Sequence, residues 1–328
     1  MIYKPVIIVA GEPNSIFFEI FFKSLKKNNF KKTLILIGSL KLLKLQMKKL
    51  NYKRKIRLLE VSKLKKYKLN NLSINLINVE YNQKNAFEKI SIKSNSYIEN
   101  SFKLAIKLLK NGYSDKLING PISKKTFLNK KYLGITEYLT KKFLVNKSAM
   151  LIYNKELSVC PVTTHLPLKL VTKKINKKII SDKIKLINSF YKKKFSIIPR
   201  IAVLGVNPHC ESVLKQNEDD VIVRPLIKKL IKSNYKVSGP HSADTIFLKK
   251  NRTKYDVILG MYHDQVLTPL KTLFEHDAIN ITLGLPFIRI SPDHGPNKKM
   301  LGKNISNPLS LIRAIEFLDK NWLKLKKV

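Results

Sequence analysis

The stretch Tyr255–Gly295 reads YDVILGMYHDQVLTPLKTLFEHDAINITLGLPFIRISPDHG. Its apolar run Val257–Leu259 is short and ends at Gly260, which predicts a buried strand of an α/β sheet. His263 follows at the carboxyl end of that strand, and ligands bind at this edge in open α/β sheets. The segment concentrates groups that suit a metal-assisted reaction on an anionic small molecule: His263, Asp264, Lys271, Asp277, Asn280, Arg289 and Asp293.

Outside this stretch, short apolar runs alternate with helical patterns, which predicts an α/β architecture with a largely parallel sheet. Strands are expected at Pro5–Ala10, Thr33–Ile37, Lys55–Leu59, Ile74–Val79, Lys116–Asn119 and Arg200–Val206. An antiparallel pair is expected at Ser148–Tyr153 and Leu157–Val162. Helices are expected at Ser15–Lys27, Leu40–Leu50, Ser94–Lys110, Asn176–Lys193, Asp219–Lys232 and Pro308–Leu325. We also expect Gly120–Lys124 to turn into a helix, and Gly239-Pro240 to form a turn.

The length of 328 residues exceeds the usual size of a single core. We therefore expect one domain built of two lobes. The first lobe would comprise approximately residues 1–135 and 300–328, and the second approximately 136–299. A hydrophobic content of 44% is sufficient for such a core and excludes a disordered chain.

The formal charge of +42 suggests nucleic acid as a partner. However, only seven of the 64 basic residues are arginine, the usual residue for bidentate contacts to phosphates and bases. The lysines are spread along the whole chain, and no nucleic-acid-binding motif is present. The composition therefore favours solvated helix faces and argues against specific nucleic-acid recognition, although a positive field would still attract anionic substrates.

The two cysteines, Cys160 and Cys210, are too few for a disulfide framework and are expected to be reduced thiols. The apolar run in MIYKPVIIVAGEP is far shorter than the hydrophobic region of a signal peptide. No uncharged stretch approaches the ~20 residues of a membrane span. We therefore expect a cytoplasmic protein without membrane contact.

Three histidines lie in similar sequence contexts. His165, His209 and His263 are 44 and 54 residues apart, so no local metal-binding motif connects them, but each follows an apolar, strand-like run within a few residues. Strands of one sheet can bring their carboxyl ends to a common edge. Three imidazoles there would suit a catalytic divalent ion such as Zn²⁺. A structural, hydrogen-bonded role is the alternative for each histidine taken alone.

Several motifs, in order along nearly the whole chain, resemble the 4-hydroxythreonine-4-phosphate dehydrogenase family of pyridoxal phosphate biosynthesis. In the opening stretch these are MYHDQ, the following Lys271, NITLGLPFIR and DHG. Further upstream lie NGPISK (Asn119–Lys124), VTTHLPL (Val162–Leu168), NPH (Asn207–His209) and ADTIF (Ala243–Phe247).

The resemblance implies a two-lobed α/β/α fold like that of isocitrate and isopropylmalate dehydrogenases, with the active site in the interlobe cleft, and a homodimer. It implies oxidation of 4-phosphooxy-L-threonine by NAD or NADP with Zn, Mg or Co as the metal. Because no G-x-G-x-x-G fingerprint is present, an ordinary Rossmann site is not supported. His165, His209 and His263 match the metal ligands and, with Lys271, the catalytic residues; Thr136, Lys271, Asn280 and Arg289 match substrate contacts. His241, His276 and His294 match no ligand position and are expected to be structural.

Two motifs depart from the family pattern. The Gly-rich GDPAGIGPE becomes GEPNSIFFE at Gly11–Glu19, which argues against close backbone approach of a ligand there. GHTE becomes GITE, so Ile135 stands where the family has a substrate-contacting histidine. Ile135 leaves open a related dehydrogenase acting on another phosphorylated hydroxy acid, such as a phosphothreonate or phosphoerythronate. A nucleic-acid-binding protein and a three-histidine hydrolase without nicotinamide are the remaining alternatives.

Overall fold

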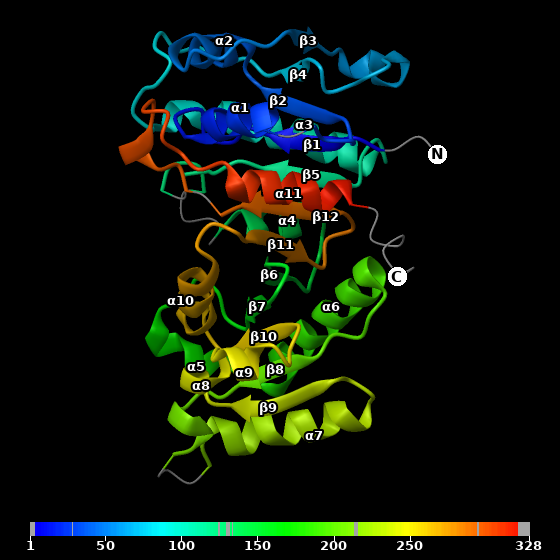
Figure 1. The fold of residues 1–328 in the computed structure, drawn as a ribbon, viewed down its shortest axis with the longest axis vertical. Helices are drawn as coiled ribbons and strands as arrows, with labels where there is room; N and C mark the ends of the chain where they lie inside the picture. The colour runs from blue at the N-terminus through cyan, green and yellow to red at the C-terminus, as the bar shows by residue number, and fades with distance from the viewer. Residues whose placement is uncertain are drawn as a thin grey trace. The chain divides into compact units, whose positions relative to one another are not determined.

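A computed structural model describes residues 4–27, 29–123, 125–128, 132, 134–212, 216–293 and 295–320. The chain divides into two compact units (Figure 1). Unit 1 joins Met1–Leu139 to Pro286–Lys320, so it unites the blue N-terminal segment with the orange and red C-terminal segment. Unit 2 contains Thr140–Leu285, drawn mainly in green and yellow. From the sequence we expect the chain to return to the first lobe near residue 300. In the structure it returns at Pro286, because the strand beginning at Ile288 pairs with a strand of unit 1.

Unit 1 carries the strand order β3-β4-β2-β1-β5-β12, and neighbouring strands in this order run parallel. The strands are β1 (Val6–Val9), β2 (Leu34–Gly38), β3 (Ile56–Leu58), β4 (Ile74–Asn78), β5 (Lys116–Asn119) and β12 (Ile288–Pro292). The central strand β1 reads VIIV and is buried along its whole length, because parallel sheets are covered on both faces.

The helices of unit 1 bury apolar stripes against this sheet and against one another. They are α1 (Phe17–Lys27), α2 (Leu40–Lys49), α3 (Asn95–Lys110) and α11 (Leu309–Asp319). In α1, Phe17 stacks on Phe21, and Phe18 stacks on Phe22, as the i, i+4 spacing of a helix requires. The helix α4 (Ile135–Lys142) contains the division between the two units.

Unit 2 carries the strand order β11-β6-β7-β10-β8-β9. The pairs β7–β10, β10–β8 and β8–β9 are parallel, while β6 is antiparallel to both β7 and β11. The strands are β6 (Ala149–Tyr153), β7 (Ser158–Pro161), β8 (Ile201–Leu204), β9 (Val237–His241), β10 (Val257–Gly260) and β11 (Ile279–Leu283). The expected antiparallel pair at β6 and β7 and the buried strand at β10 are therefore confirmed.

The longer helices of unit 2 are α6 (Lys177–Phe195), α7 (Arg224–Lys232) and α10 (His263–Phe274); α5 (Val171–Lys174), α8 (Ala243–Ile246) and α9 (Lys249–Arg252) are single turns. Asn176 caps α6 by accepting a hydrogen bond from the Ile179 amide at 3.0 Å. A π-helical turn, η5 (Asp219–Val223), leads into α7, and Pro225 is tolerated because it lies in the first turn of that helix.

Two expectations for local structure are wrong. Gly239-Pro240 is part of β9 rather than a turn, which an edge strand permits because the missing amide of proline need not pair. The second is the helix expected directly after Gly120–Lys124. The described residues 125–128 form a turn in which the Phe127 amide donates a hydrogen bond to the Ser123 carbonyl, and the next helix begins at Ile135.

Other expected features fall outside the described residues. Lys124 is one of them, and so is the expected end of the last helix near Leu325. Within the described ranges, no helix is long and apolar enough to cross a membrane.

Candidate active site

The structural centre of the candidate site in unit 1 is Arg289, which lies on β12 with only 1% of its surface exposed. Its Nε donates to Asn119 Oδ1 at 2.7 Å, and its Nη1 donates to Thr136 Oγ1 at 3.4 Å. Burial lowers the pKa of Arg289 to about 10, and the nearby carboxylate of Glu137 opposes that shift. The guanidinium therefore stays positively charged at neutral pH and is held in place by neighbours from two other motifs.

The parallel pairing of β12 with β5 explains this convergence. Arg289 pairs with Leu117, so Asn119 lies two residues further along β5, at its carboxyl end. Thr136 comes from the first turn of α4, and Ile135, half-buried, begins that helix. Asn119 belongs to NGPISK, and no sequence pattern assigns a role to its side chain. Only the strand pairing shows that its side chain binds the arginine.

The altered turn Gly11–Glu19 is closed by its own side chains. Asn14 is buried and accepts hydrogen bonds from the Glu88 amide at 2.8 Å and from Gln83 Nε2 at 3.4 Å. The hydroxyl of Ser15 donates to the Glu12 carbonyl at 2.7 Å. Burial raises the pKa of Glu12, whose carboxylate accepts hydrogen bonds from the Asn14 amide and Ser94. Ser15, which replaces a family glycine, and its neighbours Glu12 and Asn14 are thus all hydrogen-bonded at this turn.

The three candidate metal ligands of unit 2 follow three adjacent parallel strands. His165 follows β7, His263 follows β10 and His209 follows β8, and the strand order is β7-β10-β8. All three histidines therefore lie beyond the carboxyl ends of neighbouring strands, as expected from the sequence. The rings of His165 and His263 are close, with centroids 6.0 Å apart.

His263 and His209 each have oxygen partners at Nδ1. His263 Nδ1 lies 2.6 Å from Asp264 Oδ1, while His209 Nδ1 lies 3.4 Å from Ser242 Oγ and 3.9 Å from Asp244 Oδ2. Such contacts fix the ring orientation and leave Nε2 for a metal. The His209 side chain is 74% exposed and that of His263 36% exposed.

Over the residues that the structure describes, no three His, Cys, Asp or Glu side chains form a ready-made metal cluster. The structure thus brings two of the three histidines together and places the third after the next strand. The set of donors fits a divalent ion such as Zn²⁺, because imidazole nitrogens are suitable ligands and oxygen groups lie beside two of the three rings, a carboxylate at His263 and a hydroxyl at His209.

The two remaining predicted substrate contacts also belong to unit 2. Lys271 is exposed on α10, eight residues after His263. Asn280 is half-buried on β11, opposite Ile152 of β6. Its Oδ1 is buried, and no described group donates a hydrogen bond to it.

The other histidines and the cysteines have structural surroundings where these are described. His241 Nε2 contacts Ser238 Oγ at 2.8 Å and Tyr255 Oη at 3.2 Å, and burial lowers its pKa. His294 lies outside the described residues. Both cysteines are free and buried. Burial raises the pKa of Cys160 to about 12, and it also raises the pKa of Cys210. Neither thiol has the lowered pKa of a nucleophile.

The mixed α/β fold with its parallel-rich sheet is of the isocitrate/isopropylmalate dehydrogenase-like kind, and the chain is a dehydrogenase. Residues 30–318 match the family described as pyridoxal phosphate biosynthetic protein PdxA. A 4-hydroxythreonine-4-phosphate dehydrogenase from Sulfurihydrogenibium sp. is 39% identical over 315 residues, covering 94% of this chain and 95% of the relative. The chain therefore belongs to the PdxA family.

Solved structures agree. A 4-hydroxythreonine-4-phosphate dehydrogenase from Klebsiella pneumoniae superimposes with a TM-score of 0.84 at 28% identity, covering 98% of each chain. One from Burkholderia phymatum gives a TM-score of 0.78, also at 28% identity, covering 95% of this chain and 97% of that one.

Proposed function

We propose that the chain oxidises the C3 hydroxyl of 4-phosphooxy-L-threonine with NAD⁺ or NADP⁺ in pyridoxine 5′-phosphate biosynthesis. The hydride from C3 passes to the nicotinamide and the hydroxyl proton is released. The product, 2-amino-3-oxo-4-phosphooxybutanoate, is a β-keto acid and loses CO₂ to give 3-amino-2-oxopropyl phosphate. The observation that carries this proposal is the buried, positively charged Arg289 held by Asn119 and Thr136.

Each residue supplies a defined interaction. Arg289 presents a rigid fork of N–H donors that suits a phosphate or a carboxylate, and Thr136 adds a hydroxyl beside it. Lys271 contributes a second positive charge, and the side-chain amide of Asn280 offers both a donor and an acceptor. Arg289 and Thr136 in unit 1 thus suit one anionic group of a phosphorylated amino acid, and Lys271 in unit 2 suits another.

His165, His209 and His263 would hold the divalent ion, which is Zn²⁺, Mg²⁺ or Co²⁺. Such an ion supplies Lewis-acid chemistry that lowers the pKa of a hydroxyl group in contact with it. The strand order β7-β10-β8 and the proximity of the His165 and His263 rings support this assignment. The contacts of His263 with Asp264, and of His209 with Ser242, would keep both imidazoles oriented.

The chain forms one catalytic domain that works as a homodimer in the cytoplasm. The family resemblance supports the dimer, and the two free, buried cysteines are those of a protein from a reducing compartment. Light scattering coupled to size-exclusion chromatography should give twice the 37.9 kDa mass of the chain. A mass of 37.9 kDa at micromolar concentration would contradict the dimer.

Ile135 favours one second candidate, a dehydrogenase of another phosphorylated hydroxy acid such as phosphothreonate or phosphoerythronate. Ile135 begins α4 next to Thr136 and offers only apolar surface where the family has a histidine. For a substrate that lacks the group contacted by this histidine, the change from histidine to isoleucine would not weaken binding.

Purified protein incubated with each hydroxy acid, each nicotinamide and each metal separates these candidates through the absorbance at 340 nm. We expect the highest kcat/KM with 4-phosphooxy-L-threonine, loss of activity with a chelator, and recovery when Zn²⁺, Co²⁺ or Mg²⁺ is added. A much higher kcat/KM with another hydroxy acid would contradict the substrate. A rate unchanged by the chelator would contradict the metal, and no reduction of either nicotinamide would contradict the reaction.

A further inference from the structure

The carboxyl ends of β7 and β10 are fastened together by a threonine that has no role in the proposed chemistry. Thr163 lies between β7 and His165, and it is buried. Its hydroxyl donates to the Met261 carbonyl oxygen at 2.7 Å, and its amide donates to the same oxygen at 3.2 Å. The loop that carries His165 is thereby attached to the segment that leads into His263.

A single glutamine joins the ends of β10 and β8. Gln265 Oε1 accepts a hydrogen bond from the Met261 amide at 2.7 Å, and Gln265 Nε2 donates to the Gly205 carbonyl at 2.9 Å. Met261 immediately follows β10, and Gly205 immediately follows β8. One side-chain amide therefore connects the segment that carries His263 to the segment that carries His209.

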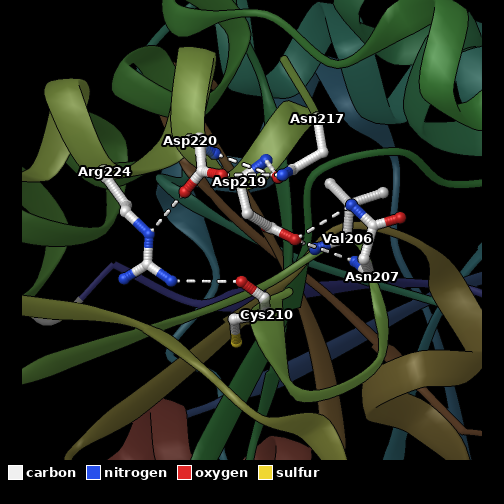
Figure 2. A network of polar contacts seen from close by, with 7 residues as sticks. All are labelled: Val206, Asn207, Cys210, Asn217, Asp219, Asp220 and Arg224. Atoms are coloured by element: carbon white, nitrogen blue, oxygen red, sulfur yellow. Dashed lines mark hydrogen bonds and ion pairs between the residues drawn. The ribbon is translucent and has the colours of Figure 1, made fainter. Parts of the chain in front are cut away.

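An aspartate holds the next residues of the His209 segment, as Figure 2 shows. Asp219 is fully buried, and its carboxylate accepts hydrogen bonds from the Val206 amide at 2.8 Å and from the Asn207 amide at 3.0 Å. Asn207 Nδ2 adds a third hydrogen bond at 3.1 Å. The carboxylate thus fixes the backbone two residues before His209.

His209 and Cys210 occupy a backbone conformation that needs such support. Their φ angles are 54° and 61°, in the left-handed region that costs a non-glycine residue roughly 1–2 kcal/mol. Such conformations persist when their surroundings hold them. Asp219 holds the chain before this pair, and Arg224 Nη2 holds it after, by donating to the Cys210 carbonyl at 3.1 Å (Figure 2).

We propose that Gln265 is a positioning residue that sets the spacing of the His209 and His263 segments, so that three imidazoles reach one divalent ion. Thr163 holds the His165 loop against the His263 segment, and Asp219 holds the His209 segment in place. This inference rests on the proposed metal site. Residues of this kind, which support metal ligands without touching the metal, typically change metal affinity by 10–100-fold when they are replaced.

Two substitutions test the link. Gln265→Leu removes both hydrogen bonds, whereas Gln265→Glu keeps the acceptor for the Met261 amide and replaces the donor to the Gly205 carbonyl by an oxygen. Titration of the metal-free protein with Co²⁺, followed by visible absorption, gives both the affinity and the ligand geometry. We expect both variants to bind Co²⁺ about 10–100-fold more weakly than the wild type, with shifted d–d bands.

The threonine offers a conservative rescue. Thr163→Val removes the hydroxyl and should weaken Co²⁺ binding, while Thr163→Ser retains the hydroxyl and should restore the wild-type spectrum.

Asn71→Asp in unit 1 is a matched control for Gln265→Glu. The Asn71 amide likewise accepts from a backbone amide, that of Leu34, at 2.9 Å and donates to the carbonyls of Phe30 and Lys32 at 2.8 Å. Its replacement should lower the melting temperature without changing the Co²⁺ spectrum.

His209→Ala and His263→Ala separate failure of this inference from failure of the proposed metal site. If both alanine variants lose Co²⁺ while folded Gln265→Leu binds it with wild-type affinity and bands, the positioning role is wrong and the metal site stands. If the alanine variants also bind Co²⁺ normally, both are wrong. Should Gln265→Leu not fold, Gln265→Glu decides by the same criteria.

Discussion

At the scale of single residues, the proposed substrate contact of Arg289 makes the most direct prediction. Replacement by methionine keeps most of the side-chain volume and removes the charge. We expect KM for the phosphorylated substrate to rise at least about tenfold, because a hydrogen bond to a charged group contributes roughly 1.5–3 kcal/mol. Initial rates at 340 nm measure this effect, and the melting temperature reports on folding.

Arg200→Met is the matched control for that experiment. Arg200 forms an exposed ion pair with Asp256 at 3.0 Å, and such pairs contribute at most about 1 kcal/mol. Its replacement should leave KM unchanged. If Arg289→Met also stays within twofold of the wild type, Arg289 is structural and the anion is bound elsewhere.

Ile135 makes a second prediction at this scale. A histidine at the start of α4, next to Thr136, could donate a hydrogen bond to the substrate, and isoleucine cannot. If 4-phosphooxy-L-threonine is the substrate, Ile135→His should lower its KM at least severalfold, since the regained contact contributes roughly 1–3 kcal/mol. Ile135→Leu is the apolar control. An unchanged KM for Ile135→His would argue for the alternative hydroxy acids.

At the scale of elements, the end of β8 is packed so closely that a residue larger than glycine at position 205 would displace its neighbours. A Cβ there would lie 2.7 Å from Cys210 Sγ and 3.1 Å from Asp219 Oδ1. Gly205→Ala should therefore displace the His209 segment, lower stability by roughly 1–3 kcal/mol and weaken metal binding about tenfold or more. Urea unfolding and Co²⁺ titration measure the two effects separately.

Gly112→Ala is the control for a loss of stability alone. Gly112 has a φ of 68° and nothing within 4 Å of an added Cβ, so alanine should cost roughly 1–2 kcal/mol through backbone strain. Metal affinity should not change. Equal metal affinities for the two alanine variants would show that the packing at the end of β8 does not control the His209 segment.

Much of the fold could be predicted from local patterns, because strands such as β1 and β10 are continuous apolar runs and α1 has a clear apolar face. Pairing partners could not be predicted. For this reason the sequence does not predict that Asn119 binds Arg289, a contact that depends on β12 pairing with β5. The strand at Val237–His241 was hidden because Gly239-Pro240 is a turn pattern, and only its edge position permits it.

The candidate site was predictable to the same extent. The three histidines could be placed at strand ends from the apolar runs before them, and the strand order confirms that these ends are adjacent. The supporting residues were not predictable, because Gln265 and Asp219 act on backbone groups distant in sequence. No local pattern marks a side chain that binds a carbonyl 60 residues away.

At the scale of the whole molecule, the charge of +42 should produce only weak, salt-sensitive binding of nucleic acid. Lysines dominate the basic residues and are dispersed over the chain, so contacts would be to phosphates without base recognition. Fluorescence anisotropy with two unrelated duplexes should give equal affinities that fall steeply between about 50 and 200 mM salt. Nanomolar, sequence-dependent binding at about 200 mM salt would contradict this account.

The central claim is that His165, His209 and His263 bind one catalytic divalent ion in the whole protein. Anomalous scattering at the cobalt absorption edge, from crystals grown with Co²⁺, tests it most directly. We predict one anomalous peak per chain at about 2.0–2.1 Å from a ring nitrogen of each of the three histidines. A peak that omits His209, or a cobalt ion bound away from these strand ends, would contradict the claim.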